Sequence, residues 1–514
     1  MNIRILRLIA LLLSLCFLSA CSRSVPMSEN SFITLPPAEN RFTAPRGDTA
    51  REYAQTVSLY LPSVSNNLLI NVPEKILIPA DQHPAEATVR KLLSFSGSET
   101  ANPLFSEANI QLQNIQEGIE ISGSIATVNL SANAMLLPKF DLFTLKRAIT
   151  NTLLQWQDIK TVNVLVAGIE PGTDPAGSSP SGSMQSIRNE DVQAVWDSLS
   201  TRWSSEKNQS IRFSSLCTIY FPASFGRGIL SEARTVSFPG QAYQQLAGSL
   251  LEAMSAGAQI LSQTPPMPDL NALLAEPIKL EENDTGDFVI NFHFLQEANE
   301  TFVNAGIPRS VMMAAITYTM CTFIPKLQGV KIQIGNELIE GIVPSAIYEK
   351  AGEKIIFTDS VLRRSDFSSF LLSDCELYFA NHSGYLKLTR RPIPYRLAFN
   401  RRYIIEQLMQ GPQVYDSVPD LLSIFPQGIH DQDLIALDKE GSTVLVNFTD
   451  NLILSSQKMS SQQERLMVYG IVNTLCSTRA THRVRFYING AQHESFAGSV
   501  YLPGEFLMNP EIIR

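Results

Sequence analysis

The sequence predicts an α+β protein built from three tandem two-layer α/β sandwich domains, each with its helices on one face of a sheet. One pattern of strands and helices recurs three times, with a period of roughly 160 residues that suits whole domains rather than a solenoid. Hydrophobic residues make up 44% and charged residues 17% of the 514 residues, which is typical of a globular chain.

Each copy of the pattern opens with a short strand that contains a tyrosine and ends in a turn. These strands are predicted at 57–62, 217–222 and 375–380, with Tyr60, Tyr220 and Tyr378. A proline then precedes an apolar helical pattern, which fits because proline is tolerated at the start of a helix. The prolines are Pro79, Pro239 and Pro394, and the helices are predicted at 84–95, 241–256 and 397–410.

The second half of each copy contains a strand, a helix and a final strand. The first strand holds an asparagine between apolar residues, at Asn129, Asn291 and Asn447. A binding role is conceivable, but a solvent-facing or turn-bonding position on an alternating strand is the preferred interpretation. The helix is predicted around 149–153, 316–320 and 471–475, and the final strand ends at Gly168, Gly335 and Gly490.

These patterns divide the chain into successive segments. We predict a signal peptide at 1–20, a tether at 21–52 and a first domain at 53–170. A linker at 171–210, flexible by its Pro, Gly and Ser content, precedes a second domain at 211–345. A second linker at 346–371 precedes a third domain at 372–514, which includes a C-terminal extension. The apolar run at 354–357 predicts that this second linker packs against a domain.

The N-terminus is typical of an exported chain. Arg4 and Arg7 precede an apolar run at 8–17, which has the length of a signal-peptide core and is too short to span a membrane. The run ends in Leu-Ser-Ala before Cys21, which resembles the lipobox of bacterial lipoproteins; the alternative is an ordinary secretory signal with a chance cysteine. A lipid on Cys21 would be the only membrane anchor, on the extracytoplasmic face of the cell membrane, because no later apolar run reaches about 20 residues.

The composition and motifs point away from several functional classes. The net charge of −9 argues against nucleic acid as a partner. None of the six histidines forms the spacing of a zinc hydrolase, and no catalytic, metal or cofactor residue is predicted. His293 is interpreted as a packed or exposed side chain rather than a ligand, and 225–228 as a turn rather than a nucleotide-binding loop.

Two charged groups are interpreted as solvated. The acidic residues before the 288 strand lack the regular alternation of a calcium loop; they are Glu281, Glu282, Asp284 and Asp287. Four arginines give the third copy a basic patch that could contact wall polymers or anionic lipid, although ordinary solvation is preferred. They are Arg390, Arg391, Arg401 and Arg402.

Four cysteines remain after the signal peptide, and they occupy the same two places in the second and third copies. Cys217 and Cys375 precede the first-strand tyrosine by three residues, and Cys321 and Cys476 follow the helix threonine by two. The first copy has apolar Val57 and Leu154 at these places, so both positions are predicted to face the core of one domain. Disulfides are possible in an exported protein, but four buried free thiols are an equally open interpretation.

The anchors resemble the GerM family, whose GerMN domain occurs in bacterial lipoproteins of sporulation and germination. The resemblance lies in the Leu-Tyr-Leu-Pro strand at 59–62 and in the strand at 126–131, and again in the helix at 471–475 and the strand at 484–490. It covers most of 53–170, 213–340 and 372–505. It implies a fold similar to ring-building domains and a part in envelope assembly; three copies, rather than the familiar two, depart from the family layout.

Two hypotheses of function follow from these observations. The first is a non-enzymatic interaction module of the cell envelope, with unidentified envelope or sporulation proteins as partners. The alternative is a cell-wall protein that binds or modifies peptidoglycan. Equivalent polar residues that converge in one cleft, carboxylates above all, would favour the enzyme, and flat divergent surfaces would favour the interaction module.

Overall fold

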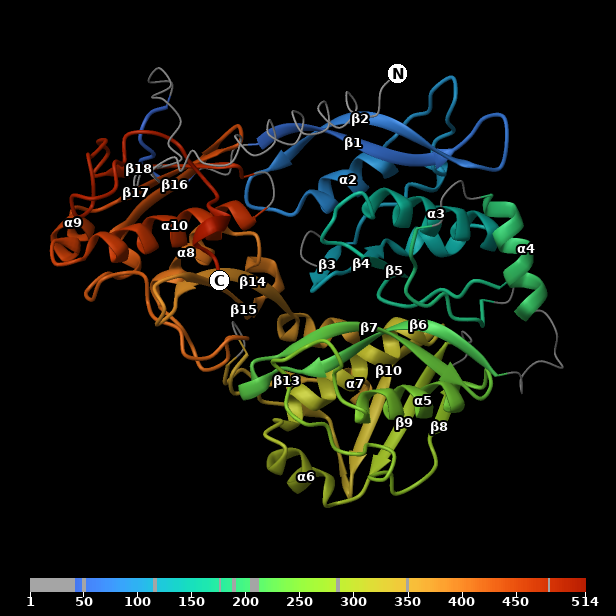
Figure 1. Cartoon of the computed structure of the whole chain (residues 1–514). Coiled ribbons are helices and arrows are strands. Elements are labelled where there is room, and N and C mark those ends of the chain that lie inside the picture. Colours follow the sequence, from blue (N-terminus) through green and yellow to red (C-terminus); the bar gives the residue numbers. More distant parts are fainter. Residues whose placement is uncertain are drawn as a thin grey trace, which may run out of the picture.

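The structure is a computed structural model that describes residues 42–48, 52–113, 118–174, 177–186, 191–203, 212–282, 287–347, 351–478 and 481–514. It confirms the predicted α+β class. Three domains with the same element order follow one another along the chain. Figure 1 shows them as separate groups of strands and helices, coloured blue to teal, green to yellow and orange to red.

Each domain begins with a long antiparallel hairpin, and a short helix follows it. The hairpin of the first domain is β1 (Glu52–Pro62) with β2 (Leu69–Pro79), and its helix is α2 (Pro84–Leu93). The prolines predicted to open the helices instead stand at or just after the end of the hairpins, because β2 ends at Pro79 and the helix begins five residues later. The equivalent elements are β6 (Phe213–Pro222), β7 (Ile229–Phe238) and α5 (Tyr243–Ser255), and then β14 (Leu372–Ala380), β15 (Leu386–Pro394) and α8 (Arg401–Met409).

A second, mixed sheet completes each domain around a parallel pair of strands. In the first domain this sheet is β3 (Ile119–Ser122), β4 (Ile125–Leu130) and β5 (Thr161–Val166), with α3 (Lys139–Leu153) joining the parallel strands β4 and β5. The second domain has β8 (Lys279–Glu282), β9 (Phe288–Phe294), α6 (Ala298–Asn304), α7 (Arg309–Phe323), β10 (Leu327–Ile334) and β11 (Glu337–Leu338). The third has β16 (Leu434–Glu440), β17 (Thr443–Phe448), α9 (Asn451–Ser456), α10 (Ser461–Ser477), β18 (Arg483–Ile488) and β19 (Phe506–Leu507).

The long helix of each domain packs against both the hairpin and the parallel strands, and three separate hydrophobic cores result. Helix α7 is the extreme case, since every residue after Arg309 is buried. A helix that is apolar on all sides must be surrounded by other elements, whereas a surface helix needs only one apolar stripe. The long helices therefore organise the domains.

The segment at 346–371 belongs to the second domain. Two short strands, β12 (Gly341–Ile342) and β13 (Ile355–Ile356), pair with each other, and the turns after them bury Phe367 and Phe370 in the core of that domain. Within the run at 354–357, Phe357 is buried and Ile355 is partly buried, whereas Lys354 and Ile356 are exposed, so the predicted packing holds for only part of the run.

The segment after residue 170 is not the flexible linker that its composition predicts. Asp174 accepts hydrogen bonds from the backbone N–H groups of Ser178 and Ser179, both at 2.6 Å, and so fixes a tight turn. The segment then runs along the joint between the first and second domains, and helix α4 (Val192–Trp203) follows it. Small polar residues serve here as hydrogen-bonding partners rather than as a solvated spacer.

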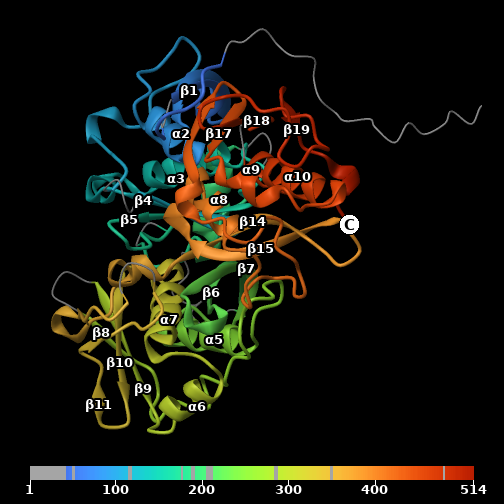
Figure 2. The ribbon, with the colours of Figure 1, turned by 90° about the vertical axis from the view of Figure 1, so that its left-hand side faces the viewer.

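The three domains pack around one another instead of forming an extended row. Figures 1 and 2 both place the second domain beneath the other two. Residues 42–48, within the predicted tether, lie on the third domain rather than the first: the side-chain amide of Asn447 donates to the carbonyl of Pro45 at 2.9 Å, and Arg402 forms an ion pair with Asp48. The start of the described chain thus joins the first and third domains.

Candidate interdomain binding site

A cleft of about 1290 Å³ lies where the three domains meet. The first and third domains contribute equivalent elements, namely the beginnings of β1 and β14 and the turns that follow α3 and α10. The second domain contributes part of β7 and the residues at 260–261. Because the elements that line the cleft come from all three domains, the site exists only when the domains are assembled.

Several carboxylates line this cleft, and most of them have partners. Glu232 accepts from the backbone N–H of Gln259 at 3.0 Å and of Ile260 at 2.8 Å, and it pairs with Arg234 at 2.8 Å. His83 contacts Asp158 at 2.9 Å, and Arg390 lies 3.3 Å from Glu376. Carboxylates committed in this way support the architecture of the cleft and are poor general bases.

Asp374 also lines the cleft, and its Oδ1 is buried and has no hydrogen-bond partner among the described residues. Burial raises the pKa of Asp374, Arg390 opposes this shift, and Glu376 adds to it. The wall of the cleft therefore contains a carboxylate oxygen that the described residues do not satisfy.

A buried ionic cluster joins the first and third domains beside the cleft. Arg401, at the start of α8, pairs with Asp81 at 2.9 Å and donates to the carbonyl of Ala80. Lys439, on β16, lies with its ammonium 3.5 Å from the centre of the Tyr53 ring. Lys439 and Tyr53 both line the cleft, so this cluster forms part of its wall.

A second ionic cluster connects the first domain to the second. Arg364 lies 3.9 Å from the centre of the Tyr318 ring and forms an ion pair with Glu120 of β3. Tyr318 in turn donates to Glu120 at 3.2 Å, and Arg364 also donates to Tyr220 at 3.2 Å. Burial and the charge of Glu120 raise the pKa of Tyr318 well above its usual value. The polar side chains of this cluster hydrogen-bond or pair with one another, so the cluster serves to hold the two domains together.

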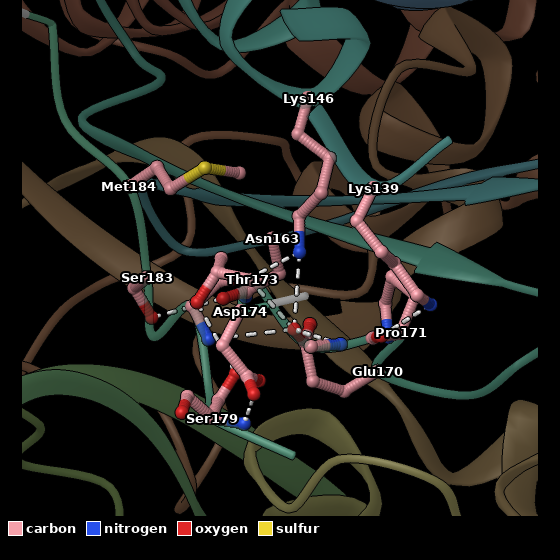
Figure 3. A network of polar contacts seen from close by, with 12 residues as sticks. Lys139, Lys146, Asn163, Glu170, Pro171, Thr173, Asp174, Ser179, Ser183 and Met184 are labelled. Carbon is pink, nitrogen blue, oxygen red and sulfur yellow. Dashed lines mark hydrogen bonds and ion pairs between the residues drawn. The ribbon is translucent and has the colours of Figure 1, made fainter. Parts of the chain in front are cut away.

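Lys146 and Ser181 are hydrogen-bonded in the same joint region, which raises the question of a serine–lysine catalytic pair. Figure 3 shows Lys146 pointing toward Glu170. Lys146, on α3, is fully buried and lies 3.0 Å from the carboxylate of Glu170. The hydroxyl of Ser181 donates to that same carboxylate at 2.6 Å. In a serine–lysine pair the lysine must be free to accept the serine proton, whereas here Glu170 pairs with Lys146 and accepts the hydrogen bond of the Ser181 hydroxyl. The arrangement is that of a buried ion pair.

Asn163 and Ser183, which lie near this pair (Figure 3), take part in polar contacts between the first and second domains. The side-chain amide of Asn163, on β5, donates to Thr218 of β6 at 2.9 Å. Ser183 contacts Thr218 at 2.7 Å and donates to Asn163 at 2.9 Å. This triangle of short polar side chains satisfies the groups that the joint buries.

The arginines predicted to form a solvated basic patch include two that are buried. Arg391 is fully buried and forms a two-point ion pair with Asp416, at 2.7 and 2.8 Å. Arg401 is 5% exposed and lies in the cluster described above. Only Arg390 and Arg402 reach the surface, and both have acidic partners. The prediction of solvated side chains is therefore wrong for Arg391 and Arg401, whereas Arg390 and Arg402 are at the surface as predicted.

The strand asparagines act as turn-bonding residues in two domains. The side-chain oxygen of Asn129 accepts from the backbone N–H of Gly168 at 2.8 Å, and that of Asn447 accepts from Gly490 at 3.0 Å. In the second domain the equivalent position is His293 rather than Asn291, because His293 pairs with the penultimate residue of β10. His293 contacts the carbonyl of Gly335 at 2.8 Å, which gives it a structural partner.

The remaining predicted site residues are placed as follows. Cys21 lies outside the described residues. The four later cysteines are free thiols, with Cys217, Cys321 and Cys375 buried and Cys476 partly buried, so the disulfide alternative is not realised. Residues 225–228 form the turn between β6 and β7. Glu281 and Glu282 stand on β8, and the described part of the chain contains no group of metal-ligating side chains.

The sequence interpretation missed Lys439, Arg364 and Glu120. Glu120 stands between two isoleucines of a strand, and this interruption of an apolar pattern was the available signal. Lys439 gave no such signal, because it occurs in an acidic and basic run that looks like a solvated hairpin turn. Its burial comes from Tyr53, which belongs to another domain.

The fold and the cleft define a multidomain α+β protein with a cleft between its domains. Residues 376–494 match the family model Germane, described as sporulation and spore germination. This match, within the third domain, confirms the predicted resemblance to the GerM family.

The solved structures that resemble this chain include two of one sporulation protein. The tandem GerMN domains of the sporulation protein GerM from Bacillus subtilis share 16% identity, over 57% of this chain and 98% of that chain, with a TM-score of 0.21. The first GerMN domain of the same protein shares 18% identity, over 27% of this chain and 98% of that chain, with a TM-score of 0.22. No curated protein matches the chain. No helix within the described residues has the length and apolar character to cross a membrane.

Proposed function

We propose that this protein is a non-enzymatic lipoprotein, anchored through Cys21 on the outer face of the cell membrane, that acts as an interaction and assembly module during sporulation or germination. The observation that carries the proposal is the Germane domain at 376–494, repeated in architecture by two further domains of the same chain. Its partners would be other envelope or sporulation proteins.

The arrangement of the domains supports an interaction role. Ionic and polar joints of buried residues hold the first domain to both others, including the Glu120–Arg364 pair and the Asp81–Arg401 pair. Because such groups are costly to bury without partners, the joints favour one defined arrangement of the three domains. A rigid assembly presents its surfaces in a fixed relation, which suits a protein that organises others.

A wall-modifying activity has less support from the same residues. The carboxylates of the cleft are mostly committed to amides and cations, and Lys146 is paired with Glu170. Binding of a wall component remains compatible with the cleft, because binding does not need a free base.

Deletion of the gene from the spore-forming organism that encodes the protein tests the role. We expect fewer heat-resistant spores or slower germination, with recovery when the wild-type gene is returned. Normal spore yield together with normal germination in the deletion strain would contradict the proposed role.

The anchor is tested with two cysteine variants of the same signal peptide. Cys21→Ala should lose incorporation of a labelled fatty acid, because the acceptor thiol is gone. Cys16→Ala, in the apolar run, is the matched control and should keep the label. Equal labelling of both variants would show that Cys21 is not the acylated residue.

A further inference from the structure

The ionic cluster between the first and third domains carries more positive charge than it neutralises. Arg401 is 5% exposed and Lys439 is 4% exposed, and both point into the same small region. Asp81 is the carboxylate paired with Arg401, and its side chain is 34% exposed to solvent. Two buried cations therefore face one carboxylate that is partly in solvent.

The donors of this cluster are also incompletely used. The Nζ of Lys439 and the Nε of Arg401 are buried and have no hydrogen-bond partner among the described residues. The Tyr53 ring stabilises the ammonium by a cation–π contact but cannot accept its N–H groups as an oxygen would. Buried cationic donors without an acceptor are unfavourable, so a binding partner that supplies an anionic oxygen would relieve the imbalance.

The cleft gives such a partner a route to the cluster. Lys439 and Tyr53 both belong to its lining, and the cleft is wide enough for a small organic ligand. Burial and the neighbouring Arg401 lower the pKa of Lys439 to about 8, so the amine is still mostly protonated at neutral pH. A ligand that reaches Lys439 at neutral pH therefore contacts a positively charged amine.

The rest of the cleft limits which anion fits. Glu52, Asp374 and Glu376 also line it, and they would repel a ligand that carries several negative charges. A singly charged carboxylate attached to amide groups satisfies the cation without this penalty. Asp374, whose Oδ1 lacks a partner, is available to accept from an amide or amine of the same ligand.

We propose that Lys439, with the charge of Arg401 behind it, binds the free carboxylate of a peptide, and that the remainder of the peptide lies in the cleft between the three domains. The wall peptides and processed protein termini found outside the membrane are both sources of this group. This binding site needs only the three assembled domains. It does not depend on the lipid on Cys21 or on the proposed role in sporulation.

Calorimetric titration of the full mature chain at neutral pH tests the site with two matched probes. The probes are acetyl-Ala-Ala with a free carboxylate and the same dipeptide as its C-terminal amide. We expect the acid to bind and the amide to bind at least about tenfold more weakly, a difference typical of one charged contact. Equal affinities, or no measurable binding of the acid, would overturn the proposal.

Two lysine variants identify the residue. Lys439→Met keeps the side-chain length but removes the charge, and it should weaken binding of the acid by roughly tenfold or more. Lys387→Met is the matched control, since Lys387 is exposed on β15 and does not line the cleft, and it should bind the acid as the wild type does. Undiminished binding by Lys439→Met would remove Lys439 from the site.

Titration with inorganic phosphate tests whether the site prefers a phosphate to a carboxylate. If phosphate binds in a manner that depends on Lys439 and the acid does not bind, the ligand is a phosphate and the proposed peptide carboxylate is wrong. Expected instead is weak or absent phosphate binding, because of the surrounding carboxylates.

Thermal unfolding without ligand separates a binding role from a structural role. If the lysine is an uncompensated buried cation, Lys439→Met should unfold at the wild-type temperature or above it. The acid should raise the unfolding temperature of the wild type but not of this variant. A marked loss of stability in Lys439→Met would show that the lysine serves the fold, and would contradict the proposal.

Discussion

The backbone N–H of Tyr378 donates a hydrogen bond to the hydroxyl of Thr474, with 3.1 Å between the N and Oγ1 atoms. Tyr378 lies on β14, which has a strand neighbour only on its other side, so the threonine of α10 takes the place of a missing strand. The same bond recurs in the other two domains, between Tyr60 and Thr152 and between Tyr220 and Thr319. The two sequence anchors shared by all three copies are thus one physical contact, which fixes the hairpin on the long helix.

The first prediction tests this contact. Thr474→Val preserves the shape of the side chain but leaves the N–H of Tyr378 buried without an acceptor. We expect a loss of about 1–3 kcal/mol in the free energy of unfolding, measured by urea denaturation of the full chain. Thr474→Ser retains the hydroxyl and should lose less. A valine variant as stable as the serine variant would show that the bond contributes nothing.

The second prediction concerns the buried pair of Arg391 and Asp416, both fully buried. Arg391→Met should lower the free energy of unfolding by about 3–5 kcal/mol, because it leaves the carboxylate of Asp416 buried without its cation. The double variant Arg391→Met with Asp416→Leu should recover part of this loss, since it buries no charge. If the single and double variants are equally unstable, the cost lies in lost packing rather than in the unpaired charge.

The sequence predicted the repeated elements because they depend on local patterns. Alternating apolar residues identify the strands, and a threonine recurs at the same place within each long helix. The helix at 241–256 and the structure's α5 differ by only a residue or two at either end. The prolines were displaced relative to the helices because a proline ends a hairpin as well as it begins a helix.

The binding site was not predictable by the same reasoning. Lys439 and Tyr53 lie almost 390 positions apart, and their contact depends on how two domains pack. Arg391 looked like part of a basic surface because its acidic partner lies in a loop 25 residues later. The prediction of a flexible linker at 171–210 was wrong for a related reason. Serine and glycine suit a flexible chain and a hydrogen-bonded joint equally well.

The third prediction concerns the free cysteines of the second and third domains. Burial raises the pKa of Cys321, Cys375 and Cys476 to about 12, and that of Cys217 well above its usual value. The reactive thiolate is therefore scarce in the native state. A soluble chain that begins at Ser22 should react slowly with a thiol reagent at pH 8 and release four equivalents only when unfolded. Fast reaction of the native protein would contradict the buried state of these thiols.

The fourth prediction concerns the pH dependence of stability caused by Lys439. Burial and the charge of Arg401 hold the pKa of Lys439 at about 8 in the folded chain, against 10.5 ordinarily, while Asp81 acts in the opposite direction. Between these values the unfolded chain binds more protons than the folded one, so the free energy of unfolding rises with pH. The slope contributed by one such group is at most about 1.4 kcal/mol per pH unit.

The measurement compares the wild type with Lys439→Met by urea denaturation at pH values from 7 to 10, without ligand. The free energy of unfolding of the wild type should increase relative to that of the variant above about pH 8, and the two should run parallel below it. The other charged groups that face Lys439 are Arg401, Asp81 and Tyr53, and they remain in both proteins, so their effects largely cancel in the difference. Parallel curves over the whole range would mean that the ammonium of Lys439 is compensated in the native protein, and the charge imbalance behind the peptide-carboxylate site would then be absent.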